Sequence, residues 1–305
     1  MNLRIGTRGS QLALTQSGWV AERLRAAHPG LTTELVVIKT SGDRIVDRPL
    51  YQVGGKGLFV KEIEEALLAK EIDCAVHSLK DMPAELPADL TIAAVPERED
   101  PRDVLLTRDG STLETLPTAA RLGTSSLRRT SLVRTLRPDL LTTSLRGNVD
   151  TRLRRLREGD TDAILLASAG LRRLGIAYAH TVPLDPRLFV PAIGQGALAL
   201  ESRRDEVEPL LQAIEHRPSR LAVEAERAFL RAVGGSCVTP LAAHAVVEDE
   251  RTMTIRGFIA RPDGTQILRG ERSGSSADRV QLGGELAAEL LGRGGADILR
   301  ELEER

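Results

Sequence analysis

The chain has 305 residues, and at roughly 150 residues per domain this length corresponds to two or three domains. Hydrophobic residues make up 41% and charged residues 28%, so folded cores are expected and extensive disorder is excluded as the default. Basic residues number 42 against 43 acidic ones, and aromatic residues are only 2%. This composition argues against a dedicated nucleic-acid binder and against a base-stacking platform.

The sequence predicts no export signal, membrane span or metal centre. Arg4 and Arg8 interrupt the region where a signal peptide would need an apolar run. No apolar stretch approaches the roughly 18 residues that cross a bilayer. There is no Cys-x-x-Cys pair, and the five histidines are scattered without the spacing of metal ligands. We therefore expect a cytoplasmic protein that binds neither metal, membrane nor nucleic acid.

Hydrophobic periodicity predicts alternating strands and helices over the first two thirds of the chain. In chain order, we expect a strand at 3–7, a helix at 11–27, strands at 33–40 and 72–76 with a helix at 58–70 between them, and then a link rich in charge and proline at 96–102. A similar run follows, with a strand at 121–124, a helix at 126–136, a strand at 140–145, a helix at 149–157 and a strand at 162–166. This alternation is typical of α/β lobes with parallel sheets.

The pattern changes after Pro218. We expect a helix at 221–232, strands at 242–247 and 253–260, and one final helix at 277–304. The predicted fold class is therefore α/β, with two lobes around a cleft and a small C-terminal α+β domain.

Arginine and hydroxyl side chains gather just after four of the predicted strands. They are Arg8 and Ser10, then Ser78, Lys80 and Asp81, then Thr124, Ser126, Arg128 and Arg129, and finally Arg146. Ligands of open α/β sheets bind at the carboxyl ends of the strands, so this pattern indicates an anion-binding cleft between the lobes. Two alternatives stay open: the serines at helix starts are caps, and single arginines belong to a solvated surface.

Carboxylates are favoured over phosphates as the bound anions. The segment Gly54-Gly55-Lys56-Gly57 lacks the spacing of a phosphate loop, with Gly57 where a magnesium-binding Ser or Thr would stand. Between Arg121 and Arg157 there are ten arginines and only two acidic residues. Guanidinium groups meet planar carboxylates with two parallel hydrogen bonds, so this excess suits a ligand that carries many carboxylates.

Eight segments now make the pattern specific. They are TRGSQLA at 7–13, KTSGD at 39–43, GGKGLF at 54–59, AVHSLKDMP at 75–83, GTSSLRR at 123–129, LRGNV at 145–149, PAIGQG at 191–196 and GSCVTP at 235–240. In this order and over nearly the whole chain they resemble the porphobilinogen deaminases, also called hydroxymethylbilane synthases. One small departure is Gly-Ser-Cys at 235–237, where the family more often has Gly-Gly-Cys.

The resemblance implies an architecture and a reaction. Two lobes like those of periplasmic binding proteins, at 1–97 with 197–215 and at 98–196, would precede a C-terminal domain at 218–305. The enzyme would be a transferase of tetrapyrrole and haem biosynthesis. It would join four porphobilinogen molecules head to tail with loss of ammonia, on a dipyrromethane cofactor held by a thioether to Cys237, and would then release hydroxymethylbilane by hydrolysis.

The resemblance also implies roles for single residues. Asp81 matches the catalytic carboxylate, which would stabilise the cationic azafulvene and move protons. The expected cofactor ligands besides Cys237 are Ser78, Lys80, Thr124, Ser126, Arg128, Arg129, Arg146 and Gly170. The expected substrate ligands are Arg8, Ser10, Lys56, Phe59, Arg146, Arg152, Arg173 and Gln195. Their partners would be porphobilinogen and the growing polypyrrole.

Several alternatives remain at this point. Phe59 also suits an ordinary core position, His77 is expected to be structural, and Cys74 is expected to be a buried small apolar residue. Two α/β lobes around an anion cleft also describe a non-catalytic solute-binding module, and the arginine cluster would suit a salt-sensitive nucleic-acid binder. No heptad stripe is present, so a monomer is expected.

Overall fold

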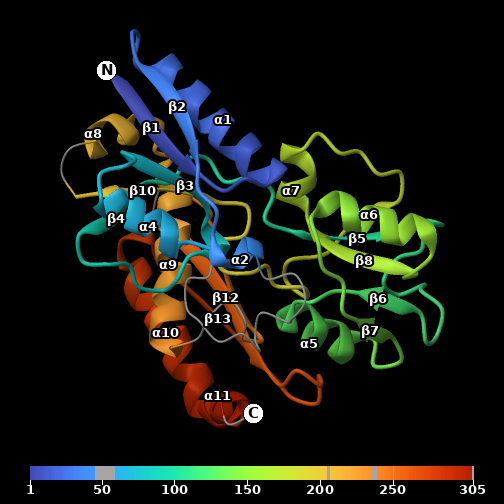
Figure 1. Cartoon of the computed structure of the whole chain (residues 1–305). Helices are drawn as coiled ribbons and strands as arrows, with labels where there is room; N and C mark the ends of the chain where they lie inside the picture. Colours follow the sequence, from blue (N-terminus) through green and yellow to red (C-terminus); the bar gives the residue numbers. More distant parts are fainter. Residues whose placement is uncertain (45–58, 205–206, 235–238, 250, 304–305) are drawn as a thin grey trace.

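The structure is a computed structural model that describes residues 1–44, 59–204, 207–234, 239–249 and 251–303. Two sheet-containing lobes lie beside each other, and a C-terminal unit packs against both (Figure 1). Its residues Ala242 and Phe258 join a core cluster of the second lobe, and its Val223 joins a cluster of the first. No helix of the described residues is long and apolar enough to cross a membrane.

The first lobe is built on a five-stranded sheet in the order β2-β1-β3-β10-β4. The strands are β1 (Asn2–Thr7), β2 (Thr32–Val37), β3 (Cys74–Ser78), β4 (Leu90–Ala94) and β10 (Leu198–Arg203). Helices α1 (Gln11–Ala27) and α4 (Lys61–Leu68) accompany this sheet, with the short helices α2 (Ser41–Arg44) and α8 (Glu208–Leu211) and the 3-10 turn η2 (Gln212–Ile214).

The second lobe repeats this plan with the strand order β7-β6-β8-β5-β9. Its strands are β5 (Asp103–Thr107), β6 (Arg121–Gly123), β7 (Leu141–Thr143), β8 (Ala163–Ala167) and β9 (Thr181–Pro183). Its helices are α5 (Leu127–Leu136), α6 (Val149–Glu158) and α7 (Ser168–Arg173).

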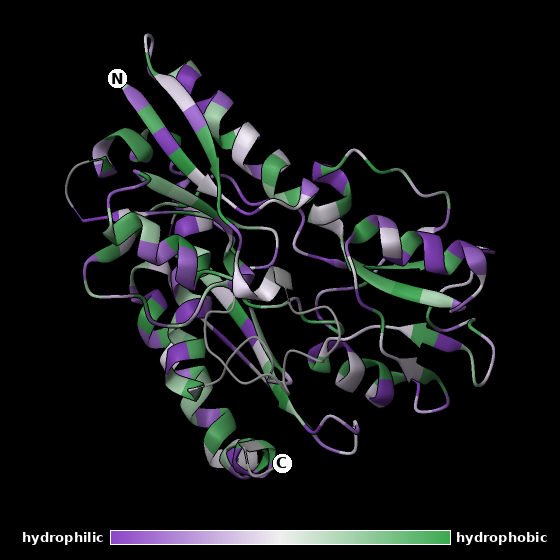
Figure 2. Cartoon of the chain, in the orientation of Figure 1, coloured by the Kyte–Doolittle hydropathy of each residue, from purple (hydrophilic) through white to green (hydrophobic). Residues whose placement is uncertain are grey.

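Strand β8 shows why the sequence forms a buried central strand. Its residues are almost all apolar (Figure 2). Leu165 packs into one core cluster, whereas Ile164 and Leu166 pack into another, so both faces of the strand are covered. A strand covered on both faces needs a continuous apolar run rather than alternation.

The prediction of parallel sheets is correct for β1, β2 and β3 and for β6, β7 and β8, but it is wrong for β10 and β5. β10 runs antiparallel to β3 and β4, and β5 runs antiparallel to β8 and β9. The reason is the path between the lobes. The chain leaves the first sheet at its carboxyl edge after β4 and enters the second sheet at the carboxyl edge, where Asp103 pairs with Ala167. Each strand that enters from this edge must run against its neighbours.

The C-terminal unit has a three-stranded antiparallel sheet, β11 (Leu241–Val247), β12 (Thr252–Ala260) and β13 (Ile267–Ser275). Helices α9 (Arg217–Val233) and α10 (Arg279–Leu290) pack on this sheet. The turn η3 (Ser276–Asp278) precedes α10, and the π-helical turn η4 (Leu291–Gly295) and α11 (Ala296–Glu303) follow it. The prediction of one unbroken final helix is wrong. Gly294 has a φ of 106°, which only glycine adopts readily, and it bends the chain between α10 and α11.

One buried carboxylate joins the C-terminal unit to the two crossing segments between the lobes. Glu226 of α9 is fully buried and accepts hydrogen bonds from Arg98 at 2.6 and 3.2 Å. It also accepts from the backbone N–H of Gly194 at 2.6 Å and from that of Ala245 at 2.8 Å. Arg98 lies between β4 and β5, Gly194 lies between β9 and β10, and Ala245 lies in β11, so one side chain connects all three units.

Candidate functional site

A cavity of about 180 Å³ lies where the two lobes and the C-terminal unit meet. Its polar lining comes from Lys80, Asp81, Ser126, Arg128, Arg129, Gln195, Arg227 and Thr239, and its apolar lining from Leu79, Met82, Ala192, Ile193, Leu230 and Leu241. The structure therefore brings together six of the residues that the sequence predicted for the site, from three separate segments of the chain.

Lys80 and Asp81 reach the cavity from the 3-10 turn η1 (Leu79–Asp81), which directly follows β3. The backbone N–H of Leu79 donates to the carbonyl of Ala197 at 3.1 Å and fixes the start of the turn to the returning strand. The half-buried carboxylate of Asp81 has no hydrogen-bond or ion-pair partner among the described residues, so its oxygens are free to meet a ligand. Burial lowers the pKa of Lys80, and the charge of Asp81 opposes this shift.

Arg128 and Arg129, at the start of α5, share a carboxylate that the sequence did not point to. Asp103 is fully buried at the first position of β5. It accepts from Arg128 at 2.7 and 3.2 Å and from Arg129 at 2.9 and 2.6 Å. Gln195 Nε2 donates to the same carboxylate at 3.2 Å and to the carbonyl of Pro101 at 2.7 Å. Because each guanidinium has five N–H donors, both arginines keep donors for a ligand.

The predicted hydroxyl residues have structural partners. Ser10 caps α1 by accepting from the N–H of Ala13 at 3.3 Å. Ser126 caps α5 by accepting from the N–H of Arg129 at 3.4 Å, and it also lines the cavity. Thr124 accepts from the N–H of Ser126 at 3.2 Å.

Ser78, at the end of β3, exchanges hydrogen bonds with the side chain of Gln16 in α1 at 3.0 and 3.2 Å. The capping alternative thus describes both Ser10 and Ser126, and only Ser126 of these four hydroxyl residues also lines the cavity.

Three further predicted arginines lie beyond the cavity lining. Burial, together with the charges of Arg129 and Arg146, lowers the pKa of Arg152 to about 10, so these three guanidiniums lie near one another. The Nε of Arg146 is buried and has no hydrogen-bond partner within the described part of the chain. Arg173 donates to the carbonyl of Gly196 at 2.6 Å, and burial lowers its pKa to about 10.

The remaining predicted residues fall elsewhere. Arg8 stacks over the ring of Phe59, 4.2 Å from its centre, at the carboxyl end of β1. Gly170 in α7 faces Leu12 of α1, because a Cβ built on it would lie 3.9 Å from that side chain. Lys56 and Cys237 lie outside the residues that the structure describes. Cys74, by contrast, is a fully buried free thiol in β3, as predicted.

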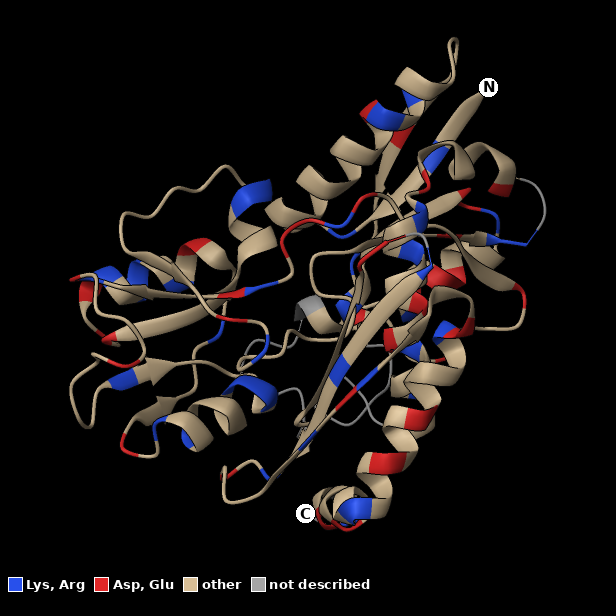
Figure 3. Cartoon of the chain, turned by 180° about the vertical axis from the view of Figure 1, so that it is seen from behind, with Lys and Arg blue, Asp and Glu red and all other residues tan. Residues whose placement is uncertain are grey.

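Many arginines of the 121–157 cluster have carboxylate partners, several of which lie outside that stretch of sequence. Besides the Asp103 pairs, the ion pairs join Arg121 to Asp162, Arg137 to Asp139, Arg154 to Glu158 and Arg155 to Asp160. In the cartoon of Figure 3, segments with acidic residues and segments with basic residues are interspersed along the chain. The local excess of positive charge counted along the sequence is therefore much smaller in space, which removes the main support for a nucleic-acid interface.

Two charged residues of the cavity region, Asp103 and Arg227, were not predicted from the sequence. Asp103 follows a proline-rich link, and its pairing with Arg128 and Arg129 spans 25 and 26 residues. Arg227 lies within the amphipathic helix α9, where an arginine suggests only a solvated face. No local signal in the sequence distinguishes either residue.

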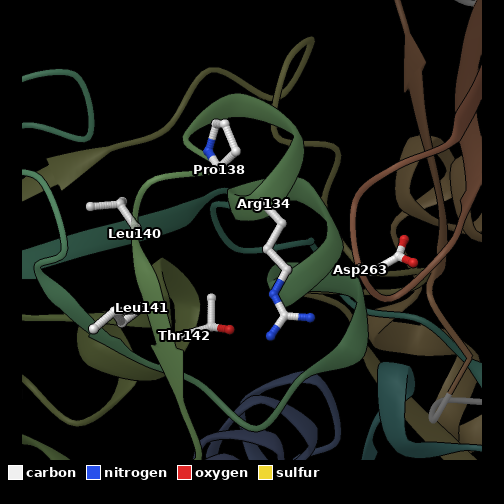
Figure 4. A pocket seen from close by; sticks show the side chains of 6 residues that line it. All are labelled: Arg134, Pro138, Leu140, Leu141, Thr142 and Asp263. Carbon is white, nitrogen blue, oxygen red and sulfur yellow. The ribbon is translucent and has the colours of Figure 1, made fainter.

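A second cavity, of about 340 Å³, lies apart from every predicted site residue. Figure 4 shows its lining side chains, which come from α5, the segment through β7 and the turn after β12. They are Arg134, Pro138, Leu140, Leu141, Thr142 and Asp263. Among the described residues, no group of three or more His, Cys, Asp or Glu side chains is arranged to hold a metal ion.

Comparison with solved structures finds two-lobed binding proteins. One is an ancestral cationic amino acid solute-binding protein, 14% identical, with a TM-score of 0.42, covering 70% of this chain and 86% of that one. Another is a putative methionine-binding lipoprotein of Bacillus subtilis, 11% identical, with a TM-score of 0.43, covering 72% of this chain and 92% of that one.

Comparison of sequences gives much stronger matches. A family model described as "Porphobilinogen deaminase, dipyromethane cofactor binding domain" matches residues 3–210, and one described as "Porphobilinogen deaminase, C-terminal domain" matches residues 220–292. The porphobilinogen deaminase of Syntrophobacter fumaroxidans is 52% identical over 302 residues, which are 98% of this chain and 97% of that protein. The porphobilinogen deaminase of Brevibacillus brevis is 50% identical over 301 residues, again 98% and 97%. The chain therefore belongs to the porphobilinogen deaminase family.

Proposed function

We propose that this chain is a porphobilinogen deaminase. As a transferase of tetrapyrrole biosynthesis, it joins four porphobilinogen molecules head to tail, releases ammonia at each step, and frees the linear product by hydrolysis. The family match supports the reaction. The single structural observation that carries the proposal is the unpaired carboxylate of Asp81, which lies in a cavity lined by cations.

The cavity fits a dipyrromethane, whose pyrrole rings carry acetate and propionate groups. Four basic residues line the cavity, namely Lys80, Arg128, Arg129 and Arg227, and one acidic residue, Asp81. Asp103 contacts Arg128 outside the lining, so positive charges still outnumber negative ones. The buried Nε of Arg146 is a further donor, and it has no acceptor among the residues that the structure describes. When attached to Cys237, the dipyrromethane supplies the pyrrole carbon that the first substrate joins.

Asp81 is the group we assign to the chemistry. Loss of ammonia from porphobilinogen leaves a cationic azafulvene, and a carboxylate beside the ring nitrogen stabilises that charge. The same carboxylate accepts and returns protons at the ring nitrogens. The turn η1 supports this role because it holds Asp81 directly after a buried strand, where few backbone motions are available.

The arginines bind carboxylates and orient the rings. Arg128, Arg129 and Arg146, with Lys80, Ser78, Thr124, Ser126 and Gly170, are assigned to the cofactor. Arg8, Ser10, Lys56, Phe59, Arg146, Arg152, Arg173 and Gln195 are assigned to the substrate chain. The lowered pKa values of Arg152 and Arg173 are consistent with this assignment, because burial destabilises each charged guanidinium and a ligand carboxylate beside it would offset part of that cost.

The proposal includes the organisation of the chain. The two lobes are residues 1–97 with 197–215 and residues 98–196, and the C-terminal domain is residues 218–305. Strand β10, which joins the sheet of the first lobe, supports the discontinuous assignment. We expect a monomer in the cytoplasm, whose partners are porphobilinogen and the polypyrrole intermediates.

Intact-protein mass spectrometry tests the proposal. The purified wild-type protein should carry the mass of a dipyrromethane, and Cys237→Ser should lack it and form no tetrapyrrole from porphobilinogen. Cys74→Ala is the matched control, because Cys74 is buried in a strand, and this variant should keep the added mass. A wild-type protein without the adduct that does not consume porphobilinogen would refute the proposed function, and so would an adduct that survives in Cys237→Ser.

A further inference from the structure

Arg227 of helix α9 is a cavity cation that comes from the C-terminal unit. Its side chain is only 6% exposed, and it lines the same cavity as Lys80 and Asp81. The other cations of that lining, Lys80, Arg128 and Arg129, come from the two lobes. Within the described residues, α9 therefore supplies the C-terminal unit's only positive charge to this cavity.

The guanidinium of Arg227 lacks a carboxylate partner within the described residues. Its one hydrogen bond goes from Nη2 to the backbone carbonyl of Ala84 at 2.9 Å. Burial and, to a smaller extent, the charge of Arg231 lower its pKa to about 10, and the charge of Glu201 opposes this shift. Glu201 already lies 3.0 Å from the ring of His77. Arg227 is thus still charged at neutral pH, and it has no counter-ion of its own.

Arg227 differs in this respect from Arg128 and Arg129, the two other arginines of the cavity lining. Arg128 and Arg129 share the carboxylate of Asp103, which compensates for part of the cost of their burial. A buried charge without a partner destabilises a fold by several kcal/mol. Such an arrangement is stable only where other interactions outweigh that cost, and an anionic ligand in the cavity would supply the missing partner.

We propose that Arg227 binds a carboxylate of the pyrrole chain beside Asp81, so that the C-terminal domain takes part in holding the substrate. This inference rests on the proposed function, since it takes the ligand to be a pyrrole acid. Within the described residues, Nη1 of Arg227 makes no hydrogen bond and Nη2 uses one N–H for Ala84, so the guanidinium keeps N–H donors for a planar carboxylate. Arg227 is therefore assigned as a binding residue, distinct from the residue at which the cofactor is attached.

The test compares Arg227→Gln and Arg227→Met with Arg217→Gln, which removes an exposed arginine from the first turn of the same helix. We expect both Arg227 variants to raise the KM for porphobilinogen, or to lower the occupancy of the dipyrromethane seen by mass spectrometry, by roughly 10- to 100-fold, as for a lost charge-assisted hydrogen bond. Measured in the Cys237→Ser background, which should carry no dipyrromethane, their melting temperatures should equal or exceed that of Cys237→Ser alone, because a buried charge without a partner is removed. Arg217→Gln should leave KM, occupancy and melting temperature unchanged.

Substrate analogues sharpen the test. Porphobilinogen monoamides, with either the acetate or the propionate made neutral, should bind more weakly to the wild type. If the neutralised group is the carboxylate that binds Arg227, the monoamide should bind Arg227→Gln almost as well as porphobilinogen does, because this variant already lacks the guanidinium.

Two results would overturn the inference. The first is that both Arg227 variants have the KM and the dipyrromethane occupancy of the wild type. The second is that their melting temperature falls while KM is unchanged, because Arg227 would then act only through its hydrogen bond to Ala84. The proposed function fails differently, because then the wild type itself would carry no dipyrromethane and would not consume porphobilinogen.

Discussion

Replacing Asp103 by asparagine removes one negative charge from the centre of the site and keeps the shape of the side chain. In the structure this fully buried carboxylate accepts four hydrogen bonds from Arg128 and Arg129, at 2.6 to 3.2 Å. An asparagine has one acceptor oxygen and cannot satisfy both guanidiniums. The variant therefore leaves two buried cations without a counter-charge.

The size of the effect follows from the titration of Asp103. Burial alone would raise its pKa, but the charges and hydrogen bonds of the two arginines outweigh burial and lower the pKa from 3.8 to about 2. At about 1.4 kcal/mol per unit, ionised Asp103 contributes roughly 2 to 3 kcal/mol to the free energy of unfolding. Because the folded-state pKa is the lower one, this stabilisation is complete above about pH 4 and is lost as the pH falls towards 2. Removing one partner of a buried pair costs roughly 3 to 5 kcal/mol, so we expect a loss of about 3 kcal/mol at neutral pH.

Urea unfolding at pH 7.5, followed by circular dichroism, measures this loss. Asp139→Asn is the matched control, because Asp139 also accepts two hydrogen bonds from an arginine, Arg137, but is only partly buried, with 30% of its side chain exposed, whereas Asp103 is fully buried. Its urea midpoint should stay close to that of the wild type. If Asp103→Asn lowered the free energy of unfolding by less than about 1 kcal/mol, the reasoning on the buried pair would be wrong.

Three further predictions concern other residues. Asp81→Asn should keep a near-normal melting temperature but lose roughly 100- to 1,000-fold in kcat, measured as ammonia release, because the negative charge beside the reacting ring is removed. Near-normal turnover would contradict the catalytic role of Asp81. Arg146→Leu should slow one or more elongation steps, seen as accumulated intermediates in mass spectra, and an unchanged distribution would place Arg146 outside the site. Burial, with the charge of Glu201, raises the pKa of half-buried Glu64 from 4.5 to about 7, against an opposing effect of His77. Because the pKa of Glu64 is higher in the folded state, the free energy of unfolding falls as the pH rises from about 4.5 through 7. Glu64→Gln removes this loss. With allowance for solvent screening, it should raise the free energy of unfolding, measured with urea, by about 1 kcal/mol at pH 8 and by little at pH 4.5. An equal effect at both pH values would show that the charge of Glu64 is not the cause.

The sequence predicted well those elements whose pattern is local. The helix at 11–27 matches α1, because its start is set by the Ser10 cap and its end by the residues before Pro29. Strands β4, β5, β9, β10 and β13 were not predicted. β4, β5 and β9 have only five, five and three residues, and β13 is mostly polar, so their local patterns are weak. β10 has six residues, but it lies far in sequence from β3 and β4, with which it pairs. Their pairing depends on distant partners, which no local period reveals.

The site shows the same division. The motifs around Lys80, Asp81, Arg128 and Arg129 placed these residues at strand ends, where the structure brings them to one cavity. The partners that set their charge could not be predicted, because Asp103 meets the two arginines only after the chain has crossed between lobes and formed the second sheet. The charge of a site is a property of the folded arrangement, whereas its residue types are a property of the sequence.

Glu226 limits how the three units can move against one another. Its carboxylate holds Arg98 and Gly194 of the two crossing segments and Ala245 of the C-terminal sheet. Atoms on a rotation axis do not move, so the lobes can turn without breaking these bonds only about an axis that passes close to Glu226. The cavity begins right beside this pivot, at Ile193 and Gln195. An opening of the lobes about such an axis would leave the inner end of the cavity almost unchanged and would widen its outer end, so a lengthening polypyrrole would gain room on the side away from Glu226.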